Sequence, residues 1–307
     1  MDKIISIDIV IPCYNVEKTI EKCIISLLSQ SYPKNKYHCY FVNDHSDDKT
    51  GEILDEYRQN QNITIIHHEQ NKGLSATRNT GVSIGNADLV AFLDGDMIVK
   101  NDWIESFLPY FKKNIIGVMG DNVPPSDIIL NPMEKYYFGS KRGARQFDDG
   151  SQISFQYMLF GNAIIKRSKL LEVGFFDEKI TKYGGEDTDL SAKIWNKYRW
   201  GFIFSKKSIS IHYHRRSINE FCFSMKTYGK YNLPILINRY PQYNKELGAD
   251  WIHSLKGYIV FNPLINMIIK SISLIIPWQI FIRYIVINSV ISGARSSKQW
   301  SKFNKKI

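Results

Sequence analysis

Residues 88–97 read Asp-Leu-Val-Ala-Phe-Leu-Asp-Gly-Asp-Met, an apolar run that stops at two carboxylates, Asp94 and Asp96. The run 89–93 has the length and content of a strand buried on both faces. We therefore expect the carboxylates where that strand ends, at the edge where open α/β sheets bind ligands. Two hard oxygen ligands there suit Mg²⁺ or Mn²⁺ carrying a diphosphate. A plain turn is the alternative, because Asp-Gly is a common turn pair and Asp94 could cap it.

The first hundred residues alternate between apolar, β-branched runs and segments with helical spacing. The expected strands are 4–12, 40–42, 63–67 and 89–93, and the helices that follow them are 17–30, 50–58, 74–85 and 103–111. Such alternation predicts an α/β fold, a Rossmann-like and mostly parallel sheet with helices on both faces. The loops after the strands then meet at one edge of the sheet.

The charge of the chain is unevenly distributed. The 307 residues are 44% hydrophobic, which is enough to bury a full core, and the formal net charge is +10. Eight basic residues and no acidic one follow Asp250: Lys256, Lys270, Arg283, Arg295, Lys298, Lys302, Lys305 and Lys306. We therefore expect a catalytic domain at 1–250 and a basic, hydrophobic helical segment at 251–307. This asymmetry favours an anionic membrane surface as partner and disfavours nucleic acid.

The loop residues have two chemical interpretations each. Asp44, at a strand end, could accept a hydrogen bond from a nucleotide base or could cap the next helix. Lys72 and Arg78 could face phosphates or remain solvated. The chain has neither a G-x-G-x-x-G fingerprint nor a Walker loop, which argues against a dinucleotide oxidoreductase and against a P-loop enzyme.

A second acidic cluster reads Gly184-Gly185-Glu186-Asp187-Thr188-Asp189-Leu190. It opens a segment with helical spacing, so its acids could simply favour the start of a helix. Following two glycines, and in a chain that already has an Asp-x-Asp motif, one of them could instead deprotonate an acceptor hydroxyl.

The cysteines show no metal-ligand spacing: Cys13, Cys23, Cys39 and Cys222. The chain starts Met1-Asp2-Lys3 and runs directly into an expected strand, without the pattern of a signal peptide. We expect buried free thiols in a reducing cytosol.

Seven motifs, taken in order, resemble family 2 glycosyltransferases of the GT-A fold over about residues 5–230. They are 10–15 with Glu17, 42–46, 71–81, 93–96, 160–163, 173–178 and 185–190. The resemblance implies an inverting transfer of a sugar from a nucleotide-diphosphate sugar, a UDP-sugar by preference, to a hydroxyl acceptor. A glycan or lipid-linked acceptor in cell-surface polysaccharide synthesis is expected. Asn43 stands where an acidic residue is more usual, which leaves the base preference open.

The resemblance also implies roles for single residues. Asp187 is the expected general base, and Asp94 contacts the sugar or the ribose. Asp96 binds Mn²⁺ or Mg²⁺ together with one of two histidines, His212 or His214, unless these are surface residues. The remaining nucleotide-sugar-binding residues are Pro12, Tyr14, Glu17, Asp44, Lys72, Arg78, Gly161, Asn162 and Glu186.

Two apolar segments, 258–276 and 278–291, follow the motifs and are separated by Pro277. Lys270 and Arg283 interrupt them, and the second is short of the roughly 20 residues needed to span a bilayer. We expect an interfacial or re-entrant helical hairpin that attaches the protein to the cytoplasmic face of the cell membrane. A helix pair packed on the catalytic domain or on a dimer partner is the alternative.

Three other functions compete with simple transfer. A nucleotidyltransferase would have a glycine-rich loop after its first strand, and residues 12–17 contain no glycine. A processive polysaccharide synthase would carry Gln-x-x-Arg-Trp well beyond the base, whereas residues 196–200 begin with Asn and follow Asp187 closely. A non-catalytic sugar-nucleotide-binding module predicts binding without turnover.

Overall fold

The computed structural model describes residues 5–112, 114–213 and 215–299. Its contacts divide the chain into two compact units. The first comprises Met1–Ile128, Gly143–Thr181 and Asp187–His214, and the second Ile129–Arg142, Lys182–Glu186 and Arg215–Ile307. Residue 250 falls within the second unit, so this unit is larger than the segment after residue 250. The domain boundary that we expect there stays a prediction.

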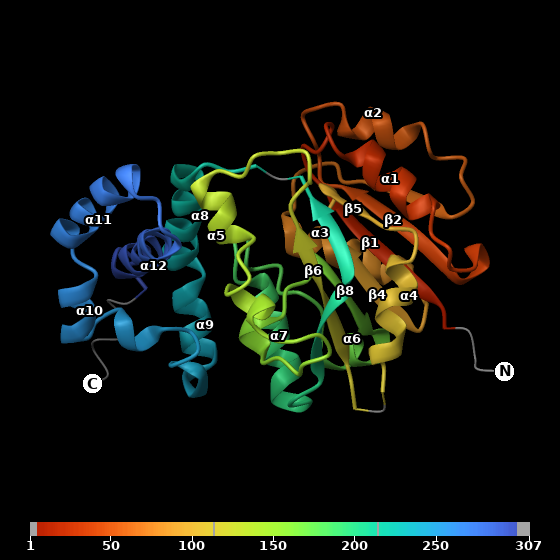
Figure 1. The fold of residues 1–307 in the computed structure, drawn as a ribbon. Coiled ribbons are helices and arrows are strands. Elements are labelled where there is room, and N and C mark those ends of the chain that lie inside the picture. The colour runs from red at the N-terminus through yellow and green to blue at the C-terminus, as the bar shows by residue number, and fades with distance from the viewer. Residues whose placement is uncertain (1–4, 113, 214, 300–307) are drawn as a thin grey trace. The chain divides into compact units, whose positions relative to one another are not determined.

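The first unit is built on a single sheet, shown in Figure 1. In the described part of the chain its strands are β1 (Ile7–Cys13), β2 (Tyr37–Asn43), β3 (Ile63–His67), β4 (Leu89–Leu93), β5 (Met97–Val99), β6 (Gly117–Val123), β7 (Asn162–Lys166) and β8 (Phe202–His212). Their order is β3-β2-β1-β4-β7-β6-β8-β5. The pairs β2–β3, β1–β2, β1–β4 and β6–β8 are parallel, and the pairs made by β7 and β5 are antiparallel. The predicted mostly parallel α/β sheet is confirmed.

Helices cover both faces of this sheet, and β1 is therefore buried on both sides. Its residues Ile7, Ile9 and Ile11 belong to one hydrophobic core with the buried side chains of α1 (Ile20–Leu28) and α4 (Trp103–Phe107). Its residue Val10 points to the opposite face, where α3 (Leu74–Ile84) packs. Gly81 permits this packing, because a Cβ there would lie 2.5 Å from Val10 Cγ1.

The expected elements agree with the structure except at their ends. The strands β3 and β4 have the predicted bounds, and β1 begins later, at Ile7. Helix α4 stops at Phe107 and continues as a 3₁₀ turn, Leu108–Tyr110, because Pro109 lacks the N–H that an α-helical bond needs. The other helices with residues in this unit are α2 (Thr50–Asp55), α6 (Arg167–Val173) and α7 (Glu186–Lys197).

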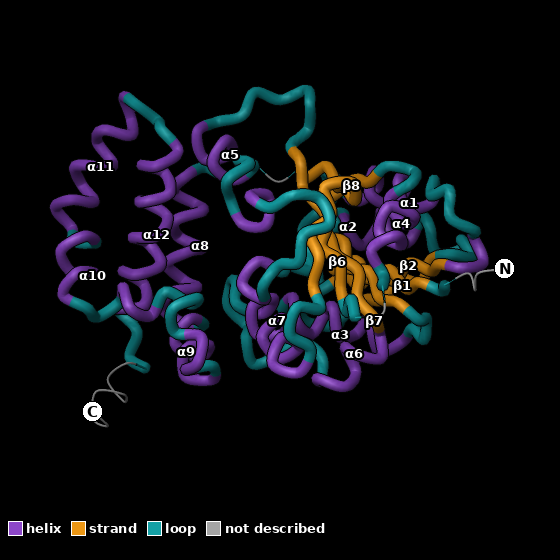
Figure 2. The backbone as a smooth tube through the Cα atoms, turned by 60° about the horizontal axis from the view of Figure 1, so that its bottom comes forward, coloured by secondary structure: helices purple, strands orange, loops and turns teal. Residues whose placement is uncertain are grey.

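The second unit is helical in its described residues, as Figure 2 shows by colour. Its helices are α5 (Pro132–Tyr137), α8 (Ile218–Tyr231), α9 (Leu233–Arg239), α10 (Leu255–Val260), α11 (Pro263–Ile275) and α12 (Gln279–Arg295). Helix α12 lies between α8 and α11 in both views. The backbones of α8 and α12 approach closely at two glycines, since a Cβ at Gly229 would overlap the Val290 carbonyl and one at Gly293 that of Lys226.

The structure separates the two apolar segments that we expected to form one interfacial hairpin. Helix α12 buries Ile282, Ile285 and Val286, and Ile282 and Val286 share a core with Met133 of α5 and Phe221 of α8. The hairpin prediction therefore does not hold for α12, which is core of the second unit, as the alternative of packed helices allowed. Helix α11, by contrast, has no buried residue. Among the described residues no helix has both the length and the apolar content to cross a bilayer.

Candidate active site

The carboxylates Asp94 and Asp96 lie directly after β4, at the carboxyl end of the strand, as the sequence predicts. The Asp94 N–H donates to the Gly161 carbonyl (3.0 Å), which fixes the turn against the start of β7. A Cβ at Gly161 would lie 2.5 Å from Asp94 Oδ2, so only glycine leaves room for this carboxylate. The observed role of Gly161 is thus to seat Asp94.

The side chain of Asn162 is committed inside the first unit. It is 2% exposed, its amide donates to the carbonyls of Asp121 and Ser208 (3.0 Å each), and its oxygen accepts from Trp103 Nε1 (2.9 Å). Both amide protons are used within the unit. The contact with the sugar nucleotide that the resemblance implies for Asn162 stays a prediction.

Asp96 and His212 come together through strand pairing. Strand β5 pairs antiparallel with β8, and this register places Met97 opposite His212. The Tyr213 N–H donates to the Asp96 carbonyl (3.0 Å), and His212 Nε2 lies 3.2 Å from Asp96 Oδ2. The resemblance implied that His212 or His214 joins Asp96 at a metal; His214 lies outside the described residues.

This pair fits part of a divalent metal site. A carboxylate oxygen and an imidazole nitrogen, both largely buried, suit Mn²⁺ with positions left open for a substrate. Within residues 5–112, 114–213 and 215–299 no cluster of three His, Cys, Asp or Glu side chains could hold a metal. A metal held by Asp96 and His212 therefore needs further ligands from a bound molecule, such as a diphosphate.

Arg78 links two of the predicted site carboxylates. Its guanidinium is buried; Nη1 donates to Asp187 Oδ1 (2.8 Å) and Nη2 to Asp94 Oδ1 (3.0 Å). The ring of Phe176 lies 5.2 Å from the guanidinium carbon. Burial raises the pKa of Asp94, and the Arg78 charge opposes that rise. Contact between Arg78 and a phosphate stays a prediction, while the structure shows a fork that fixes Asp94 and Asp187.

Asp187 stands in the first turn of α7. Gly184 and Gly185 precede it with φ of 76° and 100°, a backbone region that side chains disfavour, so these glycines allow the chain to turn into the helix. The second carboxylate oxygen of Asp187 accepts from the Phe160 N–H (3.2 Å). Glu186 belongs to the second unit. Asp189 is fully buried and paired with Lys193 (3.0 Å), which removes it as an alternative base.

Asp44 organises the loop that follows β3. It is 3% exposed; its Oδ1 accepts from the Lys72 N–H (2.8 Å) and lies 2.7 Å from His68 Nδ1, and its Oδ2 accepts from the Gly73 N–H (2.8 Å). The helix-capping alternative is thereby excluded. Contact between Asp44 and a nucleotide base stays a prediction. Such a contact would use lone pairs of the Asp44 carboxylate that these bonds leave available. The sequence interpretation missed His68, although it follows the end of β3 at the same edge.

The loop after β1 carries the remaining predicted residues. Pro12 is buried in β1, Tyr14 is exposed, and Glu17 Oε2 accepts from the Lys49 N–H (3.1 Å). Asn15, with a φ of 53°, donates through its N–H to Ser46 Oγ (3.0 Å), so the loops after β1 and β2 are held together. The Lys72 side chain is exposed.

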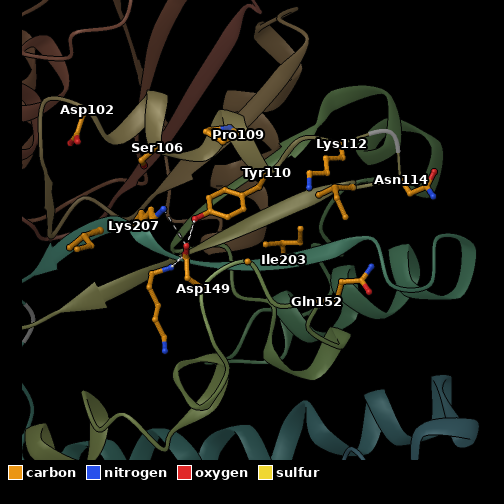
Figure 3. A pocket seen from close by; sticks show the side chains of 14 residues that line it. Asp102, Ser106, Pro109, Tyr110, Lys112, Asn114, Asp149, Gln152, Ile203 and Lys207 are labelled. Carbon is orange, nitrogen blue, oxygen red and sulfur yellow. Dashed lines mark hydrogen bonds and ion pairs between the residues drawn. The ribbon is translucent and has the colours of Figure 1, made fainter.

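A hollow of about 980 Å³ lies elsewhere on the first unit and is shown in Figure 3. The Tyr110 hydroxyl donates to Asp149 there (2.7 Å), and Lys206 and Lys207 flank the carboxylate. None of the predicted site residues lines it. The hollow is therefore separate from the site around Asp94 and Asp96.

Solved structures share this architecture. A Pyrobaculum calidifontis mannosyltransferase, PcManGT, in complex with GDP-Man and Mn²⁺, superposes with a TM-score of 0.67 over 98% of this chain and 89% of that one, at 14% identity. S. aureus TarS 1–349 in complex with UDP gives 0.55 over 98% and 92%, at 17% identity. The fold is that of GT-A glycosyltransferases.

The sequence comparison defines the family. Residues 8–174, more than half of the chain, match the model of Glycosyl transferase family 2, and the chain belongs to this family. Glycosyltransferase AglE of Haloferax volcanii is 30% identical over 171 residues, 55% of this chain. The match spans about half the length of AglE, 51%.

Proposed function

We propose that this glycosyltransferase transfers a sugar from a nucleotide-diphosphate sugar to a hydroxyl acceptor with inversion at the anomeric carbon. The observation that carries the proposal is the convergence of Asp94, Asp96 and Asp187 with Arg78 and His212 in one unit: Arg78 bonds both Asp94 and Asp187, and His212 lies beside Asp96. The solved neighbours in complex with UDP and with GDP-Man and Mn²⁺ support such a donor. A UDP-sugar is our first choice.

The residues divide the work by their chemistry. Asp96 and His212 would hold Mn²⁺ or Mg²⁺ against the diphosphate; the bound ion supplies electrostatic stabilisation of the negative charge on the leaving group. Asp94 accepts hydrogen bonds from sugar or ribose hydroxyls. The oxygen of the acceptor hydroxyl attacks the anomeric carbon from the side opposite the diphosphate, and the bond from that carbon to the diphosphate breaks. Asp187 takes the proton that the acceptor hydroxyl loses. Arg78 and the Phe160 N–H fix the Asp187 carboxylate for that step.

The proposed acceptor follows from the charge of the chain after Asp250. A lipid-linked glycan at the cytoplasmic face of the membrane, in cell-surface polysaccharide synthesis, fits a chain with eight basic and no acidic residues after Asp250. Processive synthesis is not favoured by any contact that the described residues make.

A donor screen tests the proposal. Purified protein is incubated with UDP-, GDP- and dTDP-sugars and Mn²⁺ or Mg²⁺, and release of the nucleotide diphosphate is measured. We expect metal-dependent release from one donor class, lowered roughly 10²- to 10⁴-fold by Asp187→Asn once an acceptor is present. Nucleotide binding without turnover under every condition contradicts the proposal and identifies a non-catalytic binding module.

A further inference from the structure

The second unit presents a large apolar face on α10, α11 and the start of α12, which we call the outer face. Twelve large side chains on it are between 37% and 87% exposed: Leu255, Tyr258, Ile259, Leu264, Met267, Ile268, Ile272, Leu274, Ile275, Ile276, Trp278 and Ile280. Together they expose on the order of 1,000 Å², more than the roughly 300–600 Å² of the largest patch on a typical monomer. Exposure on this scale indicates a binding surface.

Helical periodicity explains how α11 contributes to this face. At 100° per residue, Leu264, Met267 and Leu274 fall on one side of the helix, and all three are exposed. Ile265 and Ile269 fall on the other side and are partly buried, consistent with the packing of α11 against α12. In Figures 1 and 2, α10 and α11 follow one another along the same side of the unit.

Positive charges accompany the apolar side chains. Lys256, Lys270 and Arg283 are exposed on α10, α11 and α12. Each has an exposed apolar neighbour three or four residues away on its own helix, as Lys270 has in Leu274. Long basic side chains beside apolar ones can keep their charge in water while the stem lies along an apolar surface. No acidic residue occurs after Asp250 to neutralise them within this segment.

Arg295 is not one of these surface charges. Its guanidinium donates to the carbonyls of Ile252 (2.7 Å) and Phe261 (2.6 Å) and lies 4.1 Å from the ring centre of Tyr258. These bonds attach both ends of α10 to the end of α12, so the outer face is held on a fixed support.

We propose that the outer face binds the anionic surface of a lipid bilayer, with α11 lying in the interface. No helix in the described ranges is able to cross a membrane, whereas an apolar face flanked by lysine and arginine is the composition of interfacial helices. Trp278 adds an aromatic side chain of the kind that settles at headgroup depth. The apolar side chains enter the acyl boundary, and Lys256, Lys270 and Arg283 contact lipid phosphates.

A second copy of the chain fits this face less well. Pairing two copies through the same patch brings their basic side chains together, with no carboxylate in the segment to compensate. Like charges at an interface oppose association, whereas an anionic leaflet attracts every one of them. Charge complementarity therefore selects the lipid.

Vesicle sedimentation of the full chain tests the proposal and requires neither donor nor metal. The vesicles contain phosphatidylcholine alone or mixed with phosphatidylglycerol. The test variant is Leu274→Glu, in the outer face, and the matched control is Leu171→Glu, which makes the same change at an exposed site on α6 of the first unit. Both sites are exposed, so both variants should keep the thermal midpoint of the unchanged protein.

We expect the protein to bind the anionic vesicles, Leu274→Glu to weaken binding by roughly tenfold or more, and Leu171→Glu to leave it unchanged. Lys270→Gln should weaken binding to anionic vesicles roughly fivefold. Equal binding by Leu274→Glu and the unchanged protein, or complete release by salt, overturns the proposal in favour of a purely electrostatic contact. Absence of vesicle binding together with a dimer that Leu274→Glu dissociates overturns it in favour of a second copy.

Discussion

Replacement of Arg78 by lysine tests whether the guanidinium fork sets the geometry of the site. The two arms of the fork reach Asp187 (2.8 Å) and Asp94 (3.0 Å) at the same time. A lysine has one ammonium group at the end of a flexible stem, so it can pair with only one of these carboxylates at full strength. The other carboxylate then loses its charged partner.

The expected size of the effect follows from that loss. A hydrogen bond to a charged group contributes about 1.5–3 kcal/mol. Asp94 is partly solvated, its side chain being 33% exposed, so we take a loss of about 2 kcal/mol, or roughly 4–8 °C in the thermal midpoint. A general base displaced by an ångström can lower turnover by about 10²-fold, so we expect kcat to fall roughly 10- to 100-fold.

Arg167 provides a matched control. It is a buried arginine like Arg78. Its guanidinium donates to the carbonyls of Ala87 and Val82 (2.8 Å each) and to Asp8 Oδ2 (2.5 Å). Asp8 lies near the start of β1, at the end of the strand opposite the site. Arg167→Lys should therefore lower the thermal midpoint to a similar extent and leave kcat per folded molecule unchanged.

Differential scanning calorimetry and steady-state kinetics on the same preparations separate the two effects. If both variants are destabilised and neither loses turnover, the inference that Arg78 positions Asp187 is refuted. If Arg78→Lys instead raises KM for the nucleotide sugar at constant kcat, the guanidinium acts on a phosphate, as one sequence interpretation held.

Three further outcomes are expected. By calorimetry, Asp96→Asn should weaken metal-dependent binding of UDP while Asp187→Asn leaves it nearly intact, because a base acts only in the transition state; wild-type binding by both variants contradicts the metal assignment. His212→Ala should lower Mn²⁺ affinity in the same titration, and no change would return the imidazole to a structural role. Burial raises the pKa of Glu134, but hydrogen bonds from Arg215 and the Asn131 N–H outweigh this and bring it below 4.5. Its stabilisation is thus present above that pH and lost as pH falls further, so Glu134→Gln should lower the thermal midpoint more at pH 7 than at pH 3.

The order of β1 to β4 and of the helices that follow them was predictable because β1, β2 and β4 are buried along nearly their whole length and α1 has one buried side; β3 is an edge strand, and only its first residue is buried. A continuous apolar run such as Leu89–Leu93 has few structural alternatives, and carboxylates that follow it must lie at the strand end. The placement of Asp94 and Asp96 therefore followed from local sequence. It required no knowledge of the second half of the sheet.

The roles of Gly161 and Asn162 were not predictable in this way. Gly161 is needed because a Cβ would collide with Asp94, a residue far away in the sequence. The side-chain amide of Asn162 is hydrogen-bonded to groups on other elements, Trp103 among them. Such roles depend on the antiparallel pairing of β4 with β7, and nothing in either local sequence specifies that pairing.

The two apolar helices near the end of the chain illustrate the same limit. Both combine aliphatic residues with a basic residue, so hydropathy alone predicts the same interfacial location for both. The two helices differ because Gly293 of α12 and Gly229 of α8 lack side chains, which lets the backbones of α12 and α8 approach closely. Helix α11 has no glycine, so it has no equivalent way to approach a partner backbone, and its apolar side remains exposed.

The site also shows why a convergent set of acids needs the later strands. Strand β7 runs antiparallel between β4 and β6, and β8 brings its far end to β5. Without β8, β5 would lose the strand with which it pairs, and Asp96 would lack the imidazole at 3.2 Å. Without the turn at Gly184 and Gly185, α7 could not present Asp187 to Arg78. The chemistry proposed for this edge is thus distributed: the first half of the chain supplies Asp94, Asp96 and Arg78, and the second half supplies His212, beside Asp96, and Asp187, which Arg78 links to Asp94.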